Sequence, residues 1–249
     1  MLVPYLTAGD PSPDATVEIA LAAIASGADV IELGIPTEEA RPSGTEIRDS
    51  FARALAQTAS ETEVWQVCRQ LRAEAPETPI LVLAFTASIR RRGWESFISE
   101  VRRSGVDGLI IADLDEPDWL DRIASYGISP VPLLRRGISP DLAECLQSKA
   151  GHIAYRTLVP QTGVQLDIAE CVAIARLMRA EATKPYLLGF GLRHTSELRA
   201  LAPYADGFVI GSELLRRIQQ LSTKECLAVA PNWIREWKAA LTVTHAIDQ

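Results

Sequence analysis

The architecture of this chain is indicated most clearly by the stretch Ser26-Gly27-Ala28-Asp29-Val30-Ile31-Glu32-Leu33-Gly34. It has the pattern of a helix end, a glycine turn and a short apolar strand. Glycine just past a helix end is a common C-cap, because only glycine adopts the left-handed conformation at little cost. Similar stretches recur as Ser104-Gly105-Val106-Asp107 and Tyr204-Ala205-Asp206-Gly207, each before another apolar run. The recurrence predicts a regular alternation of helices and strands.

Eight short apolar runs are spaced along the chain. They are LVPYL at 2–6, DVIELGIP at 29–36, ILVLAF at 80–85, GLIIAD at 108–113, PVPLL at 130–134, HIAY at 152–155, PYLLGF at 185–190 and GFVIGS at 207–212. Such runs are typical of parallel strands buried on both faces. Helical patterns lie between them, for example at 14–25, 94–103 and 224–241. This α/β pattern predicts a closed (β/α)8 barrel. The alternative is an open doubly wound sheet, which the lack of GxGxxG after the first strand disfavours.

The chain has 249 residues, of which 47% are hydrophobic, and a formal net charge of −7. This length suits one barrel of about 250 residues, and no shift in composition suggests a linker, so we predict a single domain, 1–249. The negative charge disfavours a nucleic-acid partner, and no apolar run reaches the roughly 18–20 residues of a membrane span. The four cysteines form no CxxC pair, which predicts reduced cysteines of a cytoplasmic protein without a metal site.

Glu32 is the most informative single residue. In barrels of this type, functional groups lie at the carboxyl ends of the strands and in the loops that follow. Alternation along the strand points Glu32 into the barrel while its neighbours pack outward. A carboxylate there is costly unless it is paired or solvated, and burial raises its pKa toward the range of acid–base catalysis. Glu32 is therefore either a catalytic acid–base group or the partner of an internal arginine or lysine.

Two glycine turns follow the last two strands. They are Gly189-Phe190-Gly191 and Gly211-Ser212, and the second opens a helix. Backbone N–H groups in such turns can hold a phosphate, and the loops after strands seven and eight are the usual phosphate site of these barrels. The turns favour a phosphorylated or otherwise anionic small-molecule substrate. The alternative is that the glycines only allow the turns to close.

Several blocks of the sequence, in matching order and spacing, resemble the tryptophan synthase α subunit family. The blocks are 2–11, 27–36, 105–113, 189–191 and 205–212. The resemblance implies a (β/α)8 barrel and a carbon–carbon lyase of tryptophan biosynthesis. Such an enzyme cleaves indole-3-glycerol phosphate by a retro-aldol reaction to indole and glyceraldehyde 3-phosphate. The resemblance also implies that this subunit uses no cofactor and no metal.

The same resemblance implies roles for individual residues. The family's acid–base glutamate corresponds to Glu32, which would move protons between the glycerol hydroxyl and indole C3. The family's tyrosine late in strand six corresponds to Tyr155. The positions that would bind the phosphate are Gly163, Gly191, Gly211 and Ser212. The match at Gly163 requires that Gln161-Thr162-Gly163 replace the family's Val-Thr-Gly turn.

The loop after the second strand departs from the family pattern. Ser43 stands where the family has a second acid, which binds the indole N–H. A serine accepts a hydrogen bond but brings no charge to stabilise a developing cation, and losing such stabilisation commonly costs several powers of ten in rate. The loops at 37–45, 85–87 and 114–117 also differ from the family pattern, in which they contact the β subunit. These changes argue against a tryptophan synthase β subunit as a partner.

Arginines stand where the family has neutral groups. Arg135, Arg156 and Arg193 follow strands five, six and seven. Arginine suits bidentate contact with carboxylate or phosphate, so we expect an arginine-lined mouth that binds an anionic substrate, with surface salt bridges as the alternative. The sequence thus predicts a stand-alone lyase of this family. The alternatives are a repurposed member that catalyses another aldol, isomerisation or cyclisation step in specialised metabolism, and a non-catalytic barrel.

Overall fold

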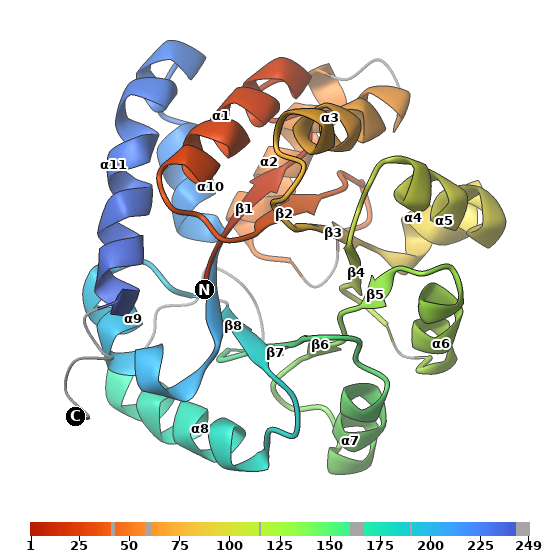
Figure 1. The fold of residues 1–249 in the computed structure, drawn as a ribbon, viewed down its shortest axis with the longest axis vertical. Coiled ribbons are helices and arrows are strands. Elements are labelled where there is room, and N and C mark those ends of the chain that lie inside the picture. The colour runs from red at the N-terminus through yellow and green to blue at the C-terminus, as the bar shows by residue number, and fades with distance from the viewer. Residues whose placement is uncertain (41–42, 58–60, 115, 160–166, 190, 243–249) are drawn as a thin grey trace.

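The computed structural model describes residues 1–249 except 41–42, 58–60, 115, 160–166, 190 and 243–249. Parallel strands curl around a common axis, and helices surround them (Figure 1). The strands are β1 (Leu2–Thr7), β2 (Ile31–Gly34), β3 (Ile80–Ala84), β4 (Gly108–Ile111), β5 (Ser129–Pro130), β6 (Leu133–Leu134), β7 (Ala154–Thr157), β8 (Tyr186–Gly189) and β9 (Gly207–Ile210). The helices are α1 (Pro13–Ala25), α2 (Thr45–Gln57), α3 (Glu61–Glu74), α4 (Thr86–Arg92), α5 (Trp94–Arg103), α6 (Asp118–Ser125), α7 (Pro140–Ser148), α8 (Ile168–Glu181), α9 (Thr195–Leu201), α10 (Ser212–Ile218) and α11 (Thr223–Thr242).

The barrel closes through a strand that is interrupted. The hydrogen-bonded order is β5-β4-β3-β2-β1-β9-β8-β7-β6, and only Val131 and Pro132 separate β5 from β6 in the chain. The Val131 N–H donates to the Leu109 carbonyl at 3.0 Å, and the Tyr155 N–H donates to the Pro132 carbonyl at 2.9 Å. This segment therefore joins both edges of the sheet. The predicted (β/α)8 barrel is confirmed, and Pro132, which has no N–H, interrupts its fifth strand.

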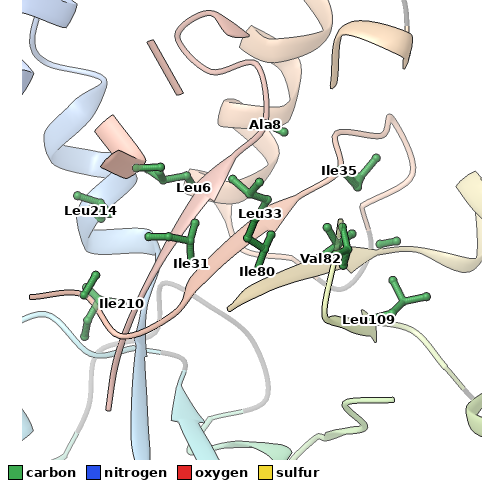
Figure 2. Close-up of a cluster of buried hydrophobic side chains, with 14 of the residues drawn as sticks. Leu6, Ala8, Ile31, Leu33, Ile35, Ile80, Val82, Leu109, Ile210 and Leu214 are labelled. Atoms are coloured by element: carbon green, nitrogen blue, oxygen red, sulfur yellow. The ribbon is translucent and has the colours of Figure 1, made fainter. Parts of the chain in front are cut away.

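Alternation along the strands separates an outer and an inner layer of buried side chains. Ile31 and Leu33 of β2 belong to the outer layer, which packs under the helices (Figure 2). Tyr5 of β1 and Leu83 of β3 belong to a separate inner cluster. Because successive side chains of a strand point to opposite faces, Glu32, between Ile31 and Leu33, points into the barrel, as its sequence position predicts.

The helices predicted at 14–25, 94–103 and 224–241 are observed as α1, α5 and α11. The Ser12 side chain caps α1 by accepting a hydrogen bond from the Ala15 N–H at 3.2 Å. Apolar residues of each helix are buried against the barrel, among them Val17 of α1, Phe97 of α5 and Trp237 of α11. No helix in the described part of the chain is long and apolar enough to cross a membrane.

The recurring stretch noted in the sequence has a common structural role at the amino ends of the strands. Each of its aspartates accepts a hydrogen bond from the first N–H of a neighbouring strand and pairs with a cation on a helix. The sets are Asp29 with Leu2 and Lys238, Asp107 with Ile80 and Arg72, and Asp206 with Tyr186 and Arg179. Gly27 and Gly105 have φ of 106° and 71°, as C-capping predicts. The third stretch differs, because Gly207 follows its aspartate and lies in β9.

Candidate active site

Glu32 lies in β2 opposite Tyr5 of β1 and Leu81 of β3. It is 1% exposed, and its Oε2 atom is buried with no hydrogen-bond partner among the described residues. Burial raises the pKa of this carboxyl to about 8, because the charged form loses its hydration. Glu32 can therefore both donate and accept a proton near neutral pH, as a general acid–base group must.

Two tyrosines share the barrel interior with Glu32. Tyr155 of β7 and Tyr5 of β1 are each 2% exposed. Burial raises the pKa of both phenols far above the usual range, and the charge of Glu32 raises them further. Both hydroxyls therefore stay protonated. Tyr155 was expected from the sequence and Tyr5 was not, although alternation along the first strand was the signal that could have placed Tyr5 inside.

The two hydroxyls occupy space that glycines leave open. A Cβ atom at Gly34 would lie 2.0 Å from Tyr5 Oη, and one at Gly189 would lie 2.4 Å from Tyr155 Oη. Protein interiors are close-packed, so neither approach is possible without a shift of the ring or the backbone. Gly34 and Gly189 therefore allow the positions of the two hydroxyls.

A cavity of about 30 Å³ lies inside the barrel. Its lining residues are Tyr5, Glu32, Ile47, Leu83, Tyr155, Gly191, Leu192, Val209, Gly211 and Ser212. Those expected from the sequence are Glu32, Tyr155, Gly191, Gly211 and Ser212. Ser212 Oγ, like Glu32 Oε2, is buried and has no partner among the described residues. Buried polar atoms are nearly always hydrogen-bonded, so this pair of oxygens marks the cavity as a place for a polar ligand or water.

Comparison with known proteins gives the same family that the sequence blocks resemble. Residues 1–241 match the family model of the tryptophan synthase alpha chain. The chain belongs to the tryptophan synthase alpha chain family. The alpha chain of Burkholderia pseudomallei (strain 1106a) is 32% identical over 96% of this chain and 90% of its own length. That of Halorhodospira halophila is 32% identical over 99% of this chain and 90% of its own length.

Solved structures of the tryptophan synthase alpha chain share this fold. Subunit alpha from Legionella pneumophila str. Paris has a TM-score of 0.87 at 28% identity, over 97% of this chain and 92% of its own. A chain of the tryptophan synthase complex from Pyrococcus furiosus has a TM-score of 0.84 at 25% identity, over 96% and 97%. The expectation of a lyase of the tryptophan synthase alpha family is therefore confirmed. The roles of individual residues stay predictions.

Arg156 does not face the cavity. It follows Tyr155 in β7, so alternation turns its side chain outward when that of Tyr155 points inward. Its guanidinium donates to Gln147 Oε1 and to the Met178 carbonyl, the latter at 3.3 Å, and lies 5.2 Å from the centre of the Tyr186 ring. The expectation that Arg156 binds substrate at the mouth was wrong for this reason, and its contacts stabilise the outer side of the barrel.

Arg135 and Arg193 are not among the residues that line the cavity of Glu32. Arg135 lines a separate outer groove of about 560 Å³ with residues of α7 and α8. The Arg193 N–H donates to Glu197 Oε2 at 2.6 Å, just before α9. The neighbouring Arg136 pairs with Glu170 at 2.9 Å. No arginine is among the described residues that line the cavity.

Ser43 lies two residues before α2 and does not line the cavity. Its N–H donates to the Ala40 carbonyl at 3.0 Å, and its carbonyl accepts from Arg48 Nη1 at 3.0 Å. Gly163 lies outside the described residues, so its proposed phosphate contact stays a prediction. In the part of the chain that the structure describes, no group of three or more His, Cys, Asp or Glu side chains could hold a metal ion.

Proposed function

We propose that this chain cleaves indole-3-glycerol phosphate to indole and glyceraldehyde 3-phosphate, with Glu32 as the acid–base group. The observation that supports this most is the cavity with two buried oxygens, Glu32 Oε2 and Ser212 Oγ, that have no partner among the described residues. A substrate hydroxyl would satisfy the first and a phosphate oxygen the second. Membership of the tryptophan synthase alpha chain family supports the choice of substrate.

The proposed reaction delivers one proton and removes one. Protonation of indole C3 makes the ring an electron acceptor. The bond from C3 to the adjacent glycerol carbon then breaks as the hydroxyl on that carbon loses its proton and becomes the aldehyde. With a pKa of about 8, Glu32 is mostly protonated at pH 7 and can donate to C3. The carboxylate so formed accepts the hydroxyl proton, so the reaction needs no co-reactant.

The other cavity residues would bind and orient the substrate. Tyr155, which burial keeps protonated, can donate a hydrogen bond to the glycerol chain. The backbone at Gly191 and Gly211, with the Ser212 hydroxyl, would hold the phosphate. The cavity of about 30 Å³ has room for only one or two waters. Binding of indole-3-glycerol phosphate therefore requires the lining to move apart.

A different acid–base reaction is the second candidate. Two observations favour it. Ser43 brings no negative charge where the family has a second acid, and the cavity of about 30 Å³ requires less opening for a substrate smaller than indole-3-glycerol phosphate. Glu32 would carry the proton in either reaction.

The test is an assay of indole released from indole-3-glycerol phosphate by the purified chain. We expect release above background by the wild type and a rate about 10²–10⁴-fold lower for Glu32→Gln, which keeps the shape of the side chain and loses the proton. Absence of indole with the wild type would contradict cleavage of this substrate. Equal rates for the two proteins would contradict the role of Glu32 but not the cleavage of this substrate.

We also propose that the chain works without a β subunit. The altered loops at 37–45, 85–87 and 114–117 support this, whereas the Pyrococcus furiosus relative is part of an a2b2 complex with mutual activation. The test adds the β subunit from the same organism to the indole assay and to gel filtration. We expect an unchanged rate and separate elution. Activation of tenfold or more, or co-elution, would contradict the proposal.

A further inference from the structure

A buried chain of hydroxyl groups connects Tyr5, in the wall of the cavity, to helix α2. Tyr5 Oη lies 3.5 Å from Thr7 Oγ1, and Thr7 Oγ1 lies 2.6 Å from Ser50 Oγ. Ser50 Oγ donates to the Ile47 carbonyl at 2.8 Å. Thr7 and Ser50 are completely buried, so bulk water does not compete for these contacts. The contact between Tyr5 and Thr7 is long for an O–H···O bond and is the weakest of the three.

The last acceptor sets the direction of the whole chain. A carbonyl oxygen can only accept, so the single proton of Ser50 is used on Ile47. Ser50 is then free to accept the proton of Thr7, which leaves the lone pairs of Thr7 Oγ1 to accept that of Tyr5. With this direction the Tyr5 proton points to Thr7, and a lone pair of its oxygen remains available on the cavity side. In this arrangement Tyr5 acts as a hydrogen-bond acceptor toward whatever occupies the cavity.

This orientation matters most for Glu32, which is opposite Tyr5 in the β1–β2 ladder and lines the same cavity. A lone pair on the cavity side repels a carboxylate and so favours the protonated carboxyl, whose Oε2 atom has no hydrogen-bond partner among the described residues. Among the described cavity-lining residues, the other titratable group is Tyr155, which stays protonated. Asp10, whose charge also acts on Tyr5, is paired with Arg53 at 2.8 Å.

We propose that Thr7 and Ser50 are positioning residues that hold Tyr5 as an acceptor and so keep Glu32 in its protonated, proton-donating form. The proposal deepens the proposed function, because delivery of a proton to indole C3 needs that form of Glu32. It applies to the unliganded protein as well, since every group in the argument belongs to the folded chain. These groups are the three hydroxyls, the Ile47 carbonyl and the Glu32 carboxyl.

The hydroxyl chain also ties the barrel interior to the altered loop. Ser50 and Ile47 belong to α2, which begins at Thr45, two residues after Ser43. Ile47 lines the cavity in addition to accepting the terminal hydrogen bond. A shift of α2 would therefore change the orientation of the Tyr5 hydroxyl and the wall of the cavity together.

The experiment measures the protonation of Glu32 directly in the unliganded protein. The carboxyl C=O stretch is followed by infrared difference spectroscopy from pH 5 to pH 10, and the band is assigned by its loss in Glu32→Gln. The variants are Thr7→Val, which keeps the shape and removes the hydroxyl, and Thr7→Ser, which keeps the hydroxyl. The same measurement is made on Tyr5→Phe and on the double variant Tyr5→Phe/Thr7→Val.

In Thr7→Val the Tyr5 hydroxyl loses its acceptor and turns to donate to the Glu32 carboxylate. We expect the pKa of Glu32 to fall by about one unit, a tenfold change in its protonation constant, and Thr7→Ser to restore the wild-type value. In the Tyr5→Phe background Thr7→Val should have no further effect, since the group that it releases is missing. An unchanged pKa in Thr7→Val, or the same shift with and without the Tyr5 hydroxyl, would overturn the proposal.

Failure of this proposal and failure of the proposed function give different results. If the pKa of Glu32 shifts as expected but the wild type releases no indole, the hydroxyl chain stands and the lyase assignment fails. If indole is released but the pKa of Glu32 does not shift, the lyase assignment stands and the proposal for the hydroxyl chain fails. Ser50→Ala provides a second route should Thr7→Val not fold, because it removes the acceptor of Thr7 and must shift the pKa of Glu32 in the same direction.

Discussion

A carboxyl group inside an apolar barrel carries a free-energy cost that depends on pH. The pKa of Glu32 is about 8 in the folded chain, against about 4.3 for an unfolded glutamate. The folded state holds the extra proton between these values, so the free energy of unfolding falls as pH rises from about 4.3 through 8. We expect Glu32→Gln to be more stable than the wild type above pH 8, by several kcal/mol. Denaturation at pH 5 and pH 9 measures this, and an identical pH dependence of the two proteins would contradict it.

Gly34 offers a test of the placement of the Tyr5 hydroxyl. Because a Cβ atom there would lie 2.0 Å from Tyr5 Oη, Gly34→Ala should displace the ring and lower kcat/KM for indole release at least tenfold. The matched control is Gly34→Ala/Tyr5→Phe, which removes the closest clashing atom. The loss caused by Gly34→Ala should be smaller in that background than in the presence of the Tyr5 hydroxyl. Full activity of Gly34→Ala would show that the contact is unimportant.

A substitution at Ser43 tests whether activity can be increased. If the family's second acid stabilises positive charge on the indole ring, Ser43→Asp should raise kcat for indole release, by about 10²-fold. Ser43→Asn, which has the same size without the charge, should not. The rates of the three proteins at saturating substrate decide this, and no gain with the aspartate would mean that position 43 does not reach the substrate.

At the level of single strands, the sequence could predict where the strands lie, but the direction of some side chains on them was missed. Each barrel strand overlaps one of the short, mostly apolar runs of the sequence, so the strands were recognisable, and alternation correctly placed Glu32 inside. The same rule places Tyr5 inside and Arg156 outside. The arginines were expected at the mouth because they follow strands in the sequence. That position shows at which end of the barrel a residue lies, but it does not show whether its side chain points inward or outward. The interruption at Pro132 was also visible, because proline lacks the N–H that a ladder needs.

The aspartates at the amino ends of the strands allow a prediction about stability alone. Asp107 accepts from the Ile80 N–H at 2.7 Å and pairs with Arg72. We expect Asp107→Asn to lower the free energy of unfolding by about 1 kcal/mol, since this carboxylate is half exposed and its ion pair is screened. The pH profile of indole release should not change, because Asp107 lies at the opposite end of the barrel. Urea denaturation provides the measurement, and an unchanged midpoint would refute the expectation.

The cavity is a property of the whole barrel rather than of any one segment. Its lining comes from the first, second, third, sixth and eighth barrel strands, from α2, and from the glycine turns after the last two strands. The sequence could assign most of these groups to one end of a barrel. It could not give the volume of about 30 Å³, because that depends on how the inner side chains, including Ile47 and Leu83, fill the interior.

The central claim is that protonated Glu32 delivers the proton that breaks the substrate's carbon–carbon bond. The most direct measurement is kcat/KM for indole release from indole-3-glycerol phosphate by the wild type, from pH 6 to pH 10. With a pKa of about 8 for Glu32, kcat/KM should be nearly constant below pH 7 and fall tenfold per pH unit above pH 8. Release of indole at a rate that does not fall through this range would contradict the claim.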